Sequence, residues 1–155
     1  MAAFIFPGQG SQKRGMGQGL FDLEEYCLVE KEVDAFFGYS MRQLCVDDQD
    51  EHLKDTQYTQ PSLYVVNSLH MFKAVIDGVQ PTHVAGHSLG EYNALLAAGV
   101  FDFMTGLQLV KKRGELMAQA KDGGMGAVIG LDRDQIMAVI RDSGIAGIDF
   151  ANFNS

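Results

Sequence analysis

A serine lies between two glycines in the stretch HVAGHSLGEY, residues 83–92, at the spacing G-x-S-x-G. In some hydrolases and transferases this spacing marks a nucleophile on a sharp turn, because glycines on either side remove side chains that would collide there. Gly86 and Gly90 fill these positions around Ser88. We therefore expect the turn to hold the Ser88 hydroxyl clear of the surrounding backbone, where it can attack a carbonyl carbon.

The segments on either side of the serine favour this interpretation. Residues 81–88 have the pattern of a strand that runs into a turn, and residues 89–99 have the composition of a helix. The backbone N–H of Leu89, at the helix start, has no intrahelical acceptor and can face a developing oxyanion. A second donor is expected from the glycine-rich turn that holds Gln9.

The alternatives to a nucleophile are a coincidental match and a nucleotide site. G-x-S-x-G alone is a weak signal in a chain with 18 glycines, and only its strand and helix context strengthens it. The loop over residues 8–19 has a lysine where a third dinucleotide-binding glycine would stand, and it lacks G-x-x-x-x-G-K-[ST]. Nucleotide binding is therefore the weaker hypothesis.

Arg113 is the second residue that can do chemistry. On a helix over residues 105–120 it lies on the flank of an apolar stripe that includes Val110 and Met117. A guanidinium at such a position needs an anion. Two hypotheses stay open: a salt bridge to an Asp or Glu of the protein, or a substrate carboxylate held by the arginine fork.

A nucleophilic serine also needs a general base. The four histidines are His52, His70, His83 and His87. His87 directly precedes Ser88, so the two side chains tend to diverge, and the other three fall in a charged loop, a helix and a strand. We assign none of them as the base.

The remaining pattern supplies the elements that position these residues. We expect a strand over residues 2–6, a helix over 20–37, and a helix over 59–79 with Pro61 at its first position. The second helix is predicted to present one apolar face, formed by Leu63, Val66, Leu69, Phe72, Val75 and Ile76.

Beyond the glycine pair at 123–124, the pattern is that of a single β-α-β unit. Strands are expected over 125–131 and 148–153, with a helix over 132–144 between them. The alternation predicts an α/β fold with a mainly parallel sheet, divided into a domain over residues 1–122 and a second one over residues 123–155.

Composition excludes several classes of partner. The 155 residues are 46% apolar and carry a formal charge of −8, which argues against nucleic acid as a partner. Cys27 and Cys45 form neither a disulfide framework nor a zinc pattern. No apolar run reaches the roughly 20 residues of a membrane span, and none forms a signal segment. We expect a cytoplasmic protein that does not bind a membrane.

Five ordered motifs resemble the malonyl-CoA:acyl carrier protein transacylase family, which includes the acyltransferase domains of fatty acid and polyketide synthases. They are FPGQGSQ (6–12), TQP (59–61), GHSLGEY (86–92), KKRGELM (111–117) and NFNS (152–155). Because the match starts a few residues after Met1, the sequence resembles the stand-alone, trans-acting type more than an excised domain.

The resemblance implies a role for each matched residue. Ser88 would accept the acyl group, the backbone amides of Gln9 and Leu89 would form the oxyanion hole, and Arg113 would bind the malonate carboxylate. His87 and Met117, which lie in the matched motifs, are further candidate substrate-binding residues. The implied partners are malonyl-CoA, as a coenzyme A thioester substrate, and an acyl carrier protein. No metal or other cofactor is implied.

The family fold is an α/β-hydrolase-like core with a small ferredoxin-like subdomain, and both would be incomplete in this chain. Only 67 residues follow Ser88, and in the family the base histidine lies further on. We therefore expect the N-terminal part of a longer enzyme, whose C-terminal half supplies the base. The alternatives are an acyl hydrolase that clears carrier proteins, which the presence of Arg113 disfavours, and a non-catalytic fragment.

Overall fold

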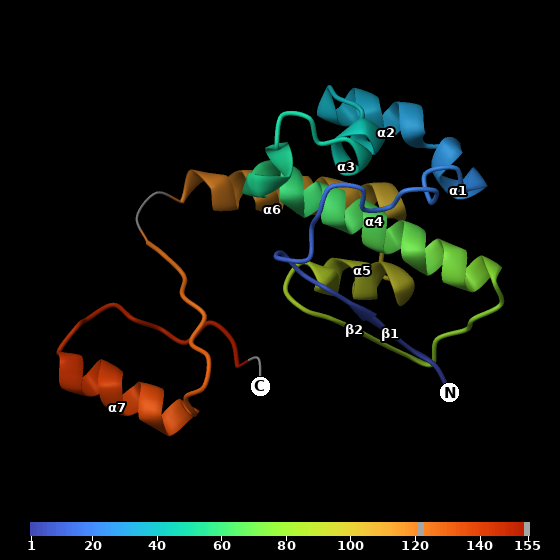
Figure 1. Ribbon diagram of the computed structural model, residues 1–155. Helices are drawn as coiled ribbons and strands as arrows, with labels where there is room; N and C mark the ends of the chain where they lie inside the picture. Colours follow the sequence, from blue (N-terminus) through green and yellow to red (C-terminus); the bar gives the residue numbers. More distant parts are fainter. Residues whose placement is uncertain (121–122, 154–155) are drawn as a thin grey trace. The chain divides into compact units, whose positions relative to one another are not determined.

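The computed structural model describes residues 1–120 and 123–153 (Figure 1). Contacts divide the chain into two units, Met1–Lys121 and Asp122–Ser155. The predicted boundary at residue 122 and the last two residues of the NFNS motif lie outside the described residues.

The first unit contains both strands and most of the helices. Its elements in chain order are β1 (Ala3–Phe6), α1 (Glu24–Cys27), α2 (Glu30–Phe37), α3 (Met41–Val46), the 3₁₀ turn η1 (His52–Lys54), α4 (Thr56–Ile76), β2 (His83–Gly86), α5 (Gly90–Ala97) and α6 (Phe103–Gln119). The second unit contains α7 (Arg133–Ser143). In the described part of the chain, no helix combines the length and the apolar character needed to cross a membrane.

The two strands pair in parallel, as expected. Ala3 aligns with His83, and Phe6 aligns with Gly86. The carboxyl ends of both strands therefore meet at one edge, where the glycine-rich loop leaves β1 and the G-x-S-x-G turn leaves β2. α5 packs against both strands and against α4 and α6, so it forms the layer between the sheet and those helices (Figure 1).

The prediction of one apolar face on α4 is wrong. From Thr59 to Leu69 every residue is buried, while Val75 and Ile76 at the C-terminal end are exposed. α6, α5, α3 and η1 all pack against α4, so it is the central helix of the unit and is covered on all sides from Thr59 to Leu69. Polar residues such as Gln60 and Asn67 are buried with it, and each forms hydrogen bonds.

The position predicted for Pro61 is also wrong, because α4 begins five residues earlier, at Thr56. The extra turn is stabilised by Thr59, whose hydroxyl donates to the carbonyls of Leu53 and Asp55 at 2.8 and 2.9 Å. Pro61 thus lies inside the helix, where it has no N–H for the carbonyl one turn earlier.

The helix predicted over residues 20–37 is divided into α1 and α2. Leu28 and Val29 separate the two pieces, and Leu28 is exposed. The guanidinium of Arg42, on α3, bonds to the Phe21 carbonyl and Asp22 before the break and to Glu30 after it. These tertiary bonds fix the two segments at a bend that helical periodicity does not reveal.

In the second unit the helix is confirmed and the two strands are not. α7 starts with a capping box at Asp132 and Gln135 and ends at Gly144 in the left-handed conformation. Among the described residues of 123–153 none lies in a strand, so the predicted strands over 125–131 and 148–153 are wrong for this chain. A strand needs a hydrogen-bonded neighbour and a buried face, and α7 buries none of its residues.

Candidate active site

Ser88 lies between the end of β2 and the start of α5, with φ at 53°. This left-handed conformation is uncommon for a residue with a side chain. The expected close packing is present on both sides of the serine. A Cβ on Gly86 would lie 2.1 Å from the backbone of Gly90, and one on Gly90 would lie 2.1 Å from the Phe6 carbonyl oxygen. Only glycine fits at these two positions.

Backbone hydrogen bonds hold the turn against β1. The N–H of His87 donates to the Phe6 carbonyl at 3.0 Å, and the N–H of Gly90 donates to the His87 carbonyl at 3.0 Å. Glu91 then donates to the carbonyl of Ser88 at 3.1 Å. Ser88 therefore lies outside the regular part of α5, and its side chain is half-buried.

A buried amide network ties the same region to α4. The side-chain nitrogen of Asn93, on α5, donates to the Tyr64 carbonyl at 2.9 Å and to the Ser68 hydroxyl at 3.0 Å. Asn67 donates to the Asn93 side chain at 3.2 Å and to the Pro7 carbonyl at 3.1 Å. The network thus joins the central helix, the helix after Ser88 and the loop after β1.

One of the two expected oxyanion donors, Leu89, follows Ser88 along the chain, and the loop that holds the other, Gln9, adjoins the serine turn in space. A Cβ on Gly8 would lie 2.5 Å from the His87 carbonyl oxygen, so the backbone before Gln9 touches the backbone before Ser88. Leu89 is the N-cap residue of α5 and is fully buried. Its N–H precedes the first hydrogen-bonded turn of the helix, as a donor for an oxyanion requires.

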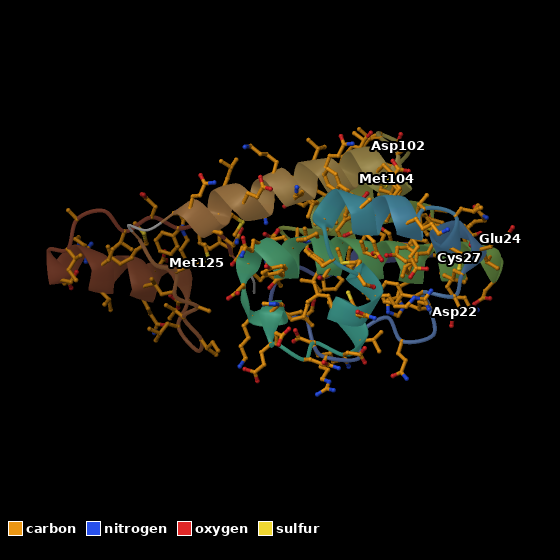
Figure 2. All side chains as sticks on the ribbon, turned by 90° about the horizontal axis from the view of Figure 1, so that it is seen from above. Asp22, Glu24, Cys27, Asp102, Met104 and Met125 are labelled. Atoms are coloured by element: carbon orange, nitrogen blue, oxygen red, sulfur yellow. The ribbon has the colours of Figure 1, made fainter. Side chains whose placement is uncertain are left out.

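Arg113 reaches Ser88 from α6. Its Nη2 donates to the Ser88 Oγ at 2.8 Å. Asp102 caps the N-terminus of this helix by accepting from the Thr105 N–H at 2.7 Å (Figure 2), and this hydrogen bond lowers the pKa of the Asp102 carboxyl. Within the part of the chain that the structure describes, no carboxylate pairs with Arg113. The salt-bridge hypothesis is therefore not supported.

Gln60 joins the site, although the sequence analysis assigned it no role. Its Oε1 accepts from Nη1 of Arg113, and its Nε2 donates to Oε1 of Gln9 at 2.7 Å. Gln9 in turn donates to the Thr56 hydroxyl at 3.3 Å. The only sequence signal for Gln60 is its place in the TQP motif; its 53-residue separation from Arg113 cannot be bridged by helical spacing.

The other two predicted residues, His87 and Met117, lie close to Ser88 and Arg113 along the chain. His87 is exposed and adjoins Gly8, where a Cβ would lie 3.1 Å from the imidazole Nδ1. Met117 lies one turn beyond Arg113 on α6 and is 42% exposed. His52 stacks on Tyr58, and His83 Nδ1 lies 3.0 Å from the Thr82 hydroxyl.

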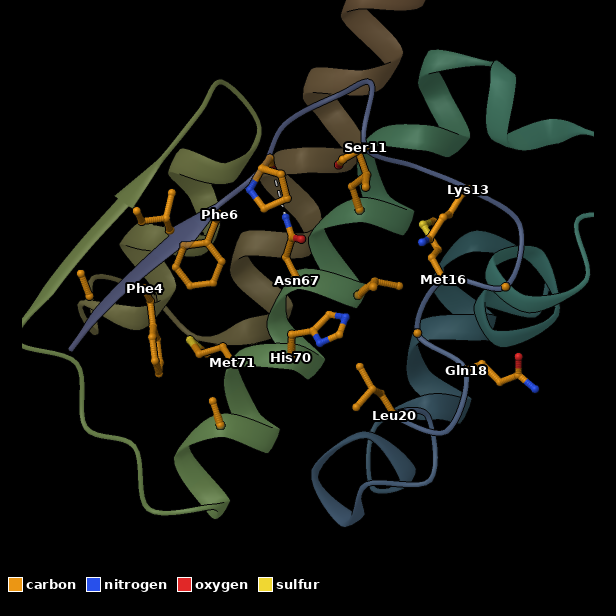
Figure 3. A pocket seen from close by; sticks show the side chains of 18 residues that line it. Phe4, Phe6, Ser11, Lys13, Met16, Gln18, Leu20, Asn67, His70 and Met71 are labelled. Atoms are coloured by element: carbon orange, nitrogen blue, oxygen red, sulfur yellow. Dashed lines mark hydrogen bonds between the residues drawn. The ribbon is translucent and has the colours of Figure 1, made fainter.

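A hollow of about 600 Å³ lies between β1, the glycine-rich loop and α4 (Figure 3). Phe4, Phe6, Met16 and Met71 give it a largely apolar lining, and Ser88, Arg113 and Gln60 do not line it. Its volume and apolar lining are typical of ligand pockets. We place the candidate reaction site at Ser88 instead, because among residues 1–120 and 123–153 it alone combines a strained nucleophile with a cation.

In the ranges 1–120 and 123–153, no group of three or more His, Cys, Asp or Glu residues is arranged to hold a metal ion. The groups that the cluster itself offers are the Ser88 hydroxyl, the Arg113 guanidinium and the amides of Gln9 and Gln60.

Comparisons with known proteins show which family the chain resembles. The acyl transferase domain family matches residues 3–148. The polyketide biosynthesis malonyl CoA-acyl carrier protein transacylase BaeC of Bacillus velezensis is 54% identical over 156 residues, which cover all of this chain and 53% of BaeC. The structure of a malonyl CoA-acyl carrier protein transacylase from Burkholderia pseudomallei has a TM-score of 0.85 at 53% identity, over 92% of this chain and 49% of that one.

A second matching structure contains a partner protein. The structure of a type II PKS acyl-carrier protein in complex with its malonyl-transacylase has a TM-score of 0.73 at 38% identity, over 90% of this chain and 47% of that one. The chain spans about half or less of the length of the curated relatives it matches. These matches confirm the α/β fold expected from the sequence, over about half the length of the matching structures.

Proposed function

The chain belongs to the acyl transferase domain family, and on this premise we propose that it carries the nucleophile of an enzyme that transfers a malonyl group from coenzyme A to an acyl carrier protein. The observation that carries the proposal is the hydrogen bond of 2.8 Å between Arg113 Nη2 and Ser88 Oγ. A malonyl thioester has a carboxylate one methylene away from its reactive carbonyl. A cation beside the nucleophile suits that acyl group.

In the first half-reaction, Ser88 Oγ attacks the thioester carbonyl carbon and its proton passes to a general base. The backbone N–H groups of Gln9 and Leu89 stabilise the oxyanion of the tetrahedral intermediate. The C–S bond then breaks, coenzyme A leaves as a thiol after taking up the proton, and a malonyl-serine ester remains.

In the second half-reaction, the phosphopantetheine thiol of the carrier protein attacks the serine ester. Its proton passes to the base and then to Ser88 Oγ as the ester bond breaks. The products are malonyl carrier protein and the original serine. We assign the general base to the part of the relatives that this chain does not span.

Arg113 must exchange partners during this cycle. In the ligand-free protein it donates to Ser88 Oγ, and with substrate bound it would donate to the malonyl carboxylate as a bidentate fork. An acetyl group lacks the carboxylate, so it would leave the half-buried guanidinium without an anion. Selection of malonyl over acetyl donors follows from this difference.

Transfer of label tests the proposal. The natural full-length protein is mixed with malonyl-CoA labelled in the malonyl group and with a phosphopantetheinylated carrier protein, and label on the carrier is measured. We expect label on the carrier with the wild-type protein and none with Ser88→Ala. Ser143→Ala is the matched control, because it removes an exposed hydroxyl that bonds to the Ile140 carbonyl and the Ile145 N–H at the end of α7.

Two other outcomes identify the alternatives. Rapid release of free malonate, with no label on the carrier, would indicate an acyl hydrolase. A protein that neither binds label nor releases it would be non-catalytic, and the proposal would be wrong.

A further inference from the structure

We propose that Gln60 is a positioning residue that sets the specificity of the site by holding Arg113 without neutralising its charge. The inference rests on the proposed function, because it assigns Arg113 to a substrate carboxylate. It goes further in naming the residue that makes the arginine available for that carboxylate.

The amide of Gln60 is fully buried, and both of its ends are used. Its Oε1 accepts from Nη1 of Arg113, and its Nε2 donates to Oε1 of Gln9 at 2.7 Å. A guanidinium has only donors, so the oxygen of the Gln60 amide must face Arg113 and the nitrogen must face Gln9. The orientation of the amide is thus set by its neighbours.

Gln60 links two parts of the site that are distant in sequence. Arg113 is on α6, while Gln9 is on the loop after β1 and supplies one proposed oxyanion donor through its backbone. The Gln9 side chain also donates to the Thr56 hydroxyl at 3.3 Å, one turn before Gln60 on α4. Displacement of Gln60 would therefore disturb the carboxylate-binding group and the oxyanion loop together.

Close packing of the two helices keeps Gln60 in place. Gly114, next to Arg113, is buried against α4, and a Cβ there would lie 3.3 Å from the Cβ of Gln60. The amide therefore has little freedom to follow the guanidinium if Arg113 moves.

The charge of the holding group matters as much as its position. A buried carboxylate in place of the amide would form an ion pair with Arg113 and compete with the malonyl carboxylate. The neutral amide accepts one hydrogen bond from Nη1 and leaves the positive charge uncompensated. Nη2, which bonds to Ser88 Oγ in the ligand-free protein, can then turn toward the substrate while Nη1 keeps its partner.

Two variants of Gln60 test the proposal in the natural full-length protein. Gln60→Met keeps the length of the side chain and removes both hydrogen bonds, whereas Gln60→Glu keeps the acceptor and adds a charge. For each we would measure kcat/KM with malonyl-CoA and with acetyl-CoA as donors. Arg113→Ala is the reference for complete loss of selectivity, and Gln57→Met, at an exposed position on the same helix, is the matched control.

We expect both Gln60 variants to lower the malonyl-to-acetyl selectivity about tenfold to hundredfold, the effect of one hydrogen bond to a charged group. The loss should lie mainly in KM for the malonyl donor, and Gln57→Met should match the wild type. A packing role alone would be rescued by Gln60→Met and would change both donors equally.

Selectivity at the wild-type level in Gln60→Met and Gln60→Glu would overturn the inference and leave the proposed function intact. If one variant fails to fold, the other decides by the same ratio. If neither folds, Gln60 serves the fold itself and the positioning role is overturned. A wild-type protein that does not transfer malonyl at all would instead overturn the proposed function.

Discussion

At the scale of single residues, Ser88 is the position where local strain and close packing coincide. Its left-handed backbone costs about 1–3 kcal/mol for a residue with a side chain. Gly86 and Gly90 lie so close to neighbouring backbone that the turn cannot relax without moving β1 or α5. The surrounding structure therefore imposes the conformation that lifts the hydroxyl out of the helix.

The two cysteines differ in burial, so we expect them to differ in their reactivity toward thiol reagents. Burial raises the pKa of the Cys45 thiol to about 12, so almost none of it is thiolate at neutral pH. Cys27 at the end of α1 is exposed (Figure 2). With a thiol reagent at neutral pH, we expect rapid labelling of Cys27 and labelling of Cys45 only after unfolding in urea.

Peptide mass analysis assigns the label to each cysteine, and Cys27→Ser serves as the control that removes the fast reaction. Equal rates for the two thiols in the native protein would contradict the burial of the Cys45 side chain, which α3 carries.

At the scale of elements, the prediction succeeded where a strand or helix is bounded by local signals. The short-range sequence pattern correctly predicted the strand before Pro7, the strand before Ser88, and the helices α5 and α6. α4 was recognised as a helix but not as a central one, because burial on all sides is decided by its neighbours. The sequence pattern suggests that the polar residues of α4 face solvent. In the structure Gln60 and Asn67 are buried and form hydrogen bonds instead.

Asn93 provides the test at this scale, because it connects α5 to α4. It is fully buried and forms hydrogen bonds with Tyr64, Asn67 and Ser68. Asn93→Ala would leave buried partners unsatisfied, so we expect the free energy of unfolding to fall by about 2–3 kcal/mol. Urea denaturation measures the change as a lower midpoint.

Asn152→Ala is the matched control, because this asparagine is exposed in the second unit. A midpoint for Asn93→Ala equal to that of the wild type would show that the amide network does not stabilise the unit.

At the scale of the whole molecule, the candidate site is assembled from four distant segments. The loop after β1, α4, the turn before α5 and α6 supply Gln9, Gln60, Ser88 and Arg113. Sequence pattern and family resemblance identified three of these residues one at a time. Neither of them identified the hydrogen bonds between these residues. Arg113 is 25 positions from Ser88 and 53 from Gln60, and no local spacing relates residues so far apart.

The second unit shows the same limit of sequence pattern, because its helix is local and its predicted strands are not. Its helix has its own caps and forms as predicted, whereas strands depend on partners that a pattern cannot supply. The assignment of residues 123–155 to a ferredoxin-like subdomain therefore stays a prediction.

The site of acylation is the most direct test of the central claim, which is that the Ser88 hydroxyl accepts the acyl group. The natural full-length protein is incubated with malonyl-CoA without a carrier protein, quenched in acid, digested and analysed by peptide mass spectrometry. We predict a malonyl ester on the peptide that contains Ser88, and none in Ser88→Ala. A malonyl ester on any other residue, or one that persists on the same peptide in Ser88→Ala, would contradict the account.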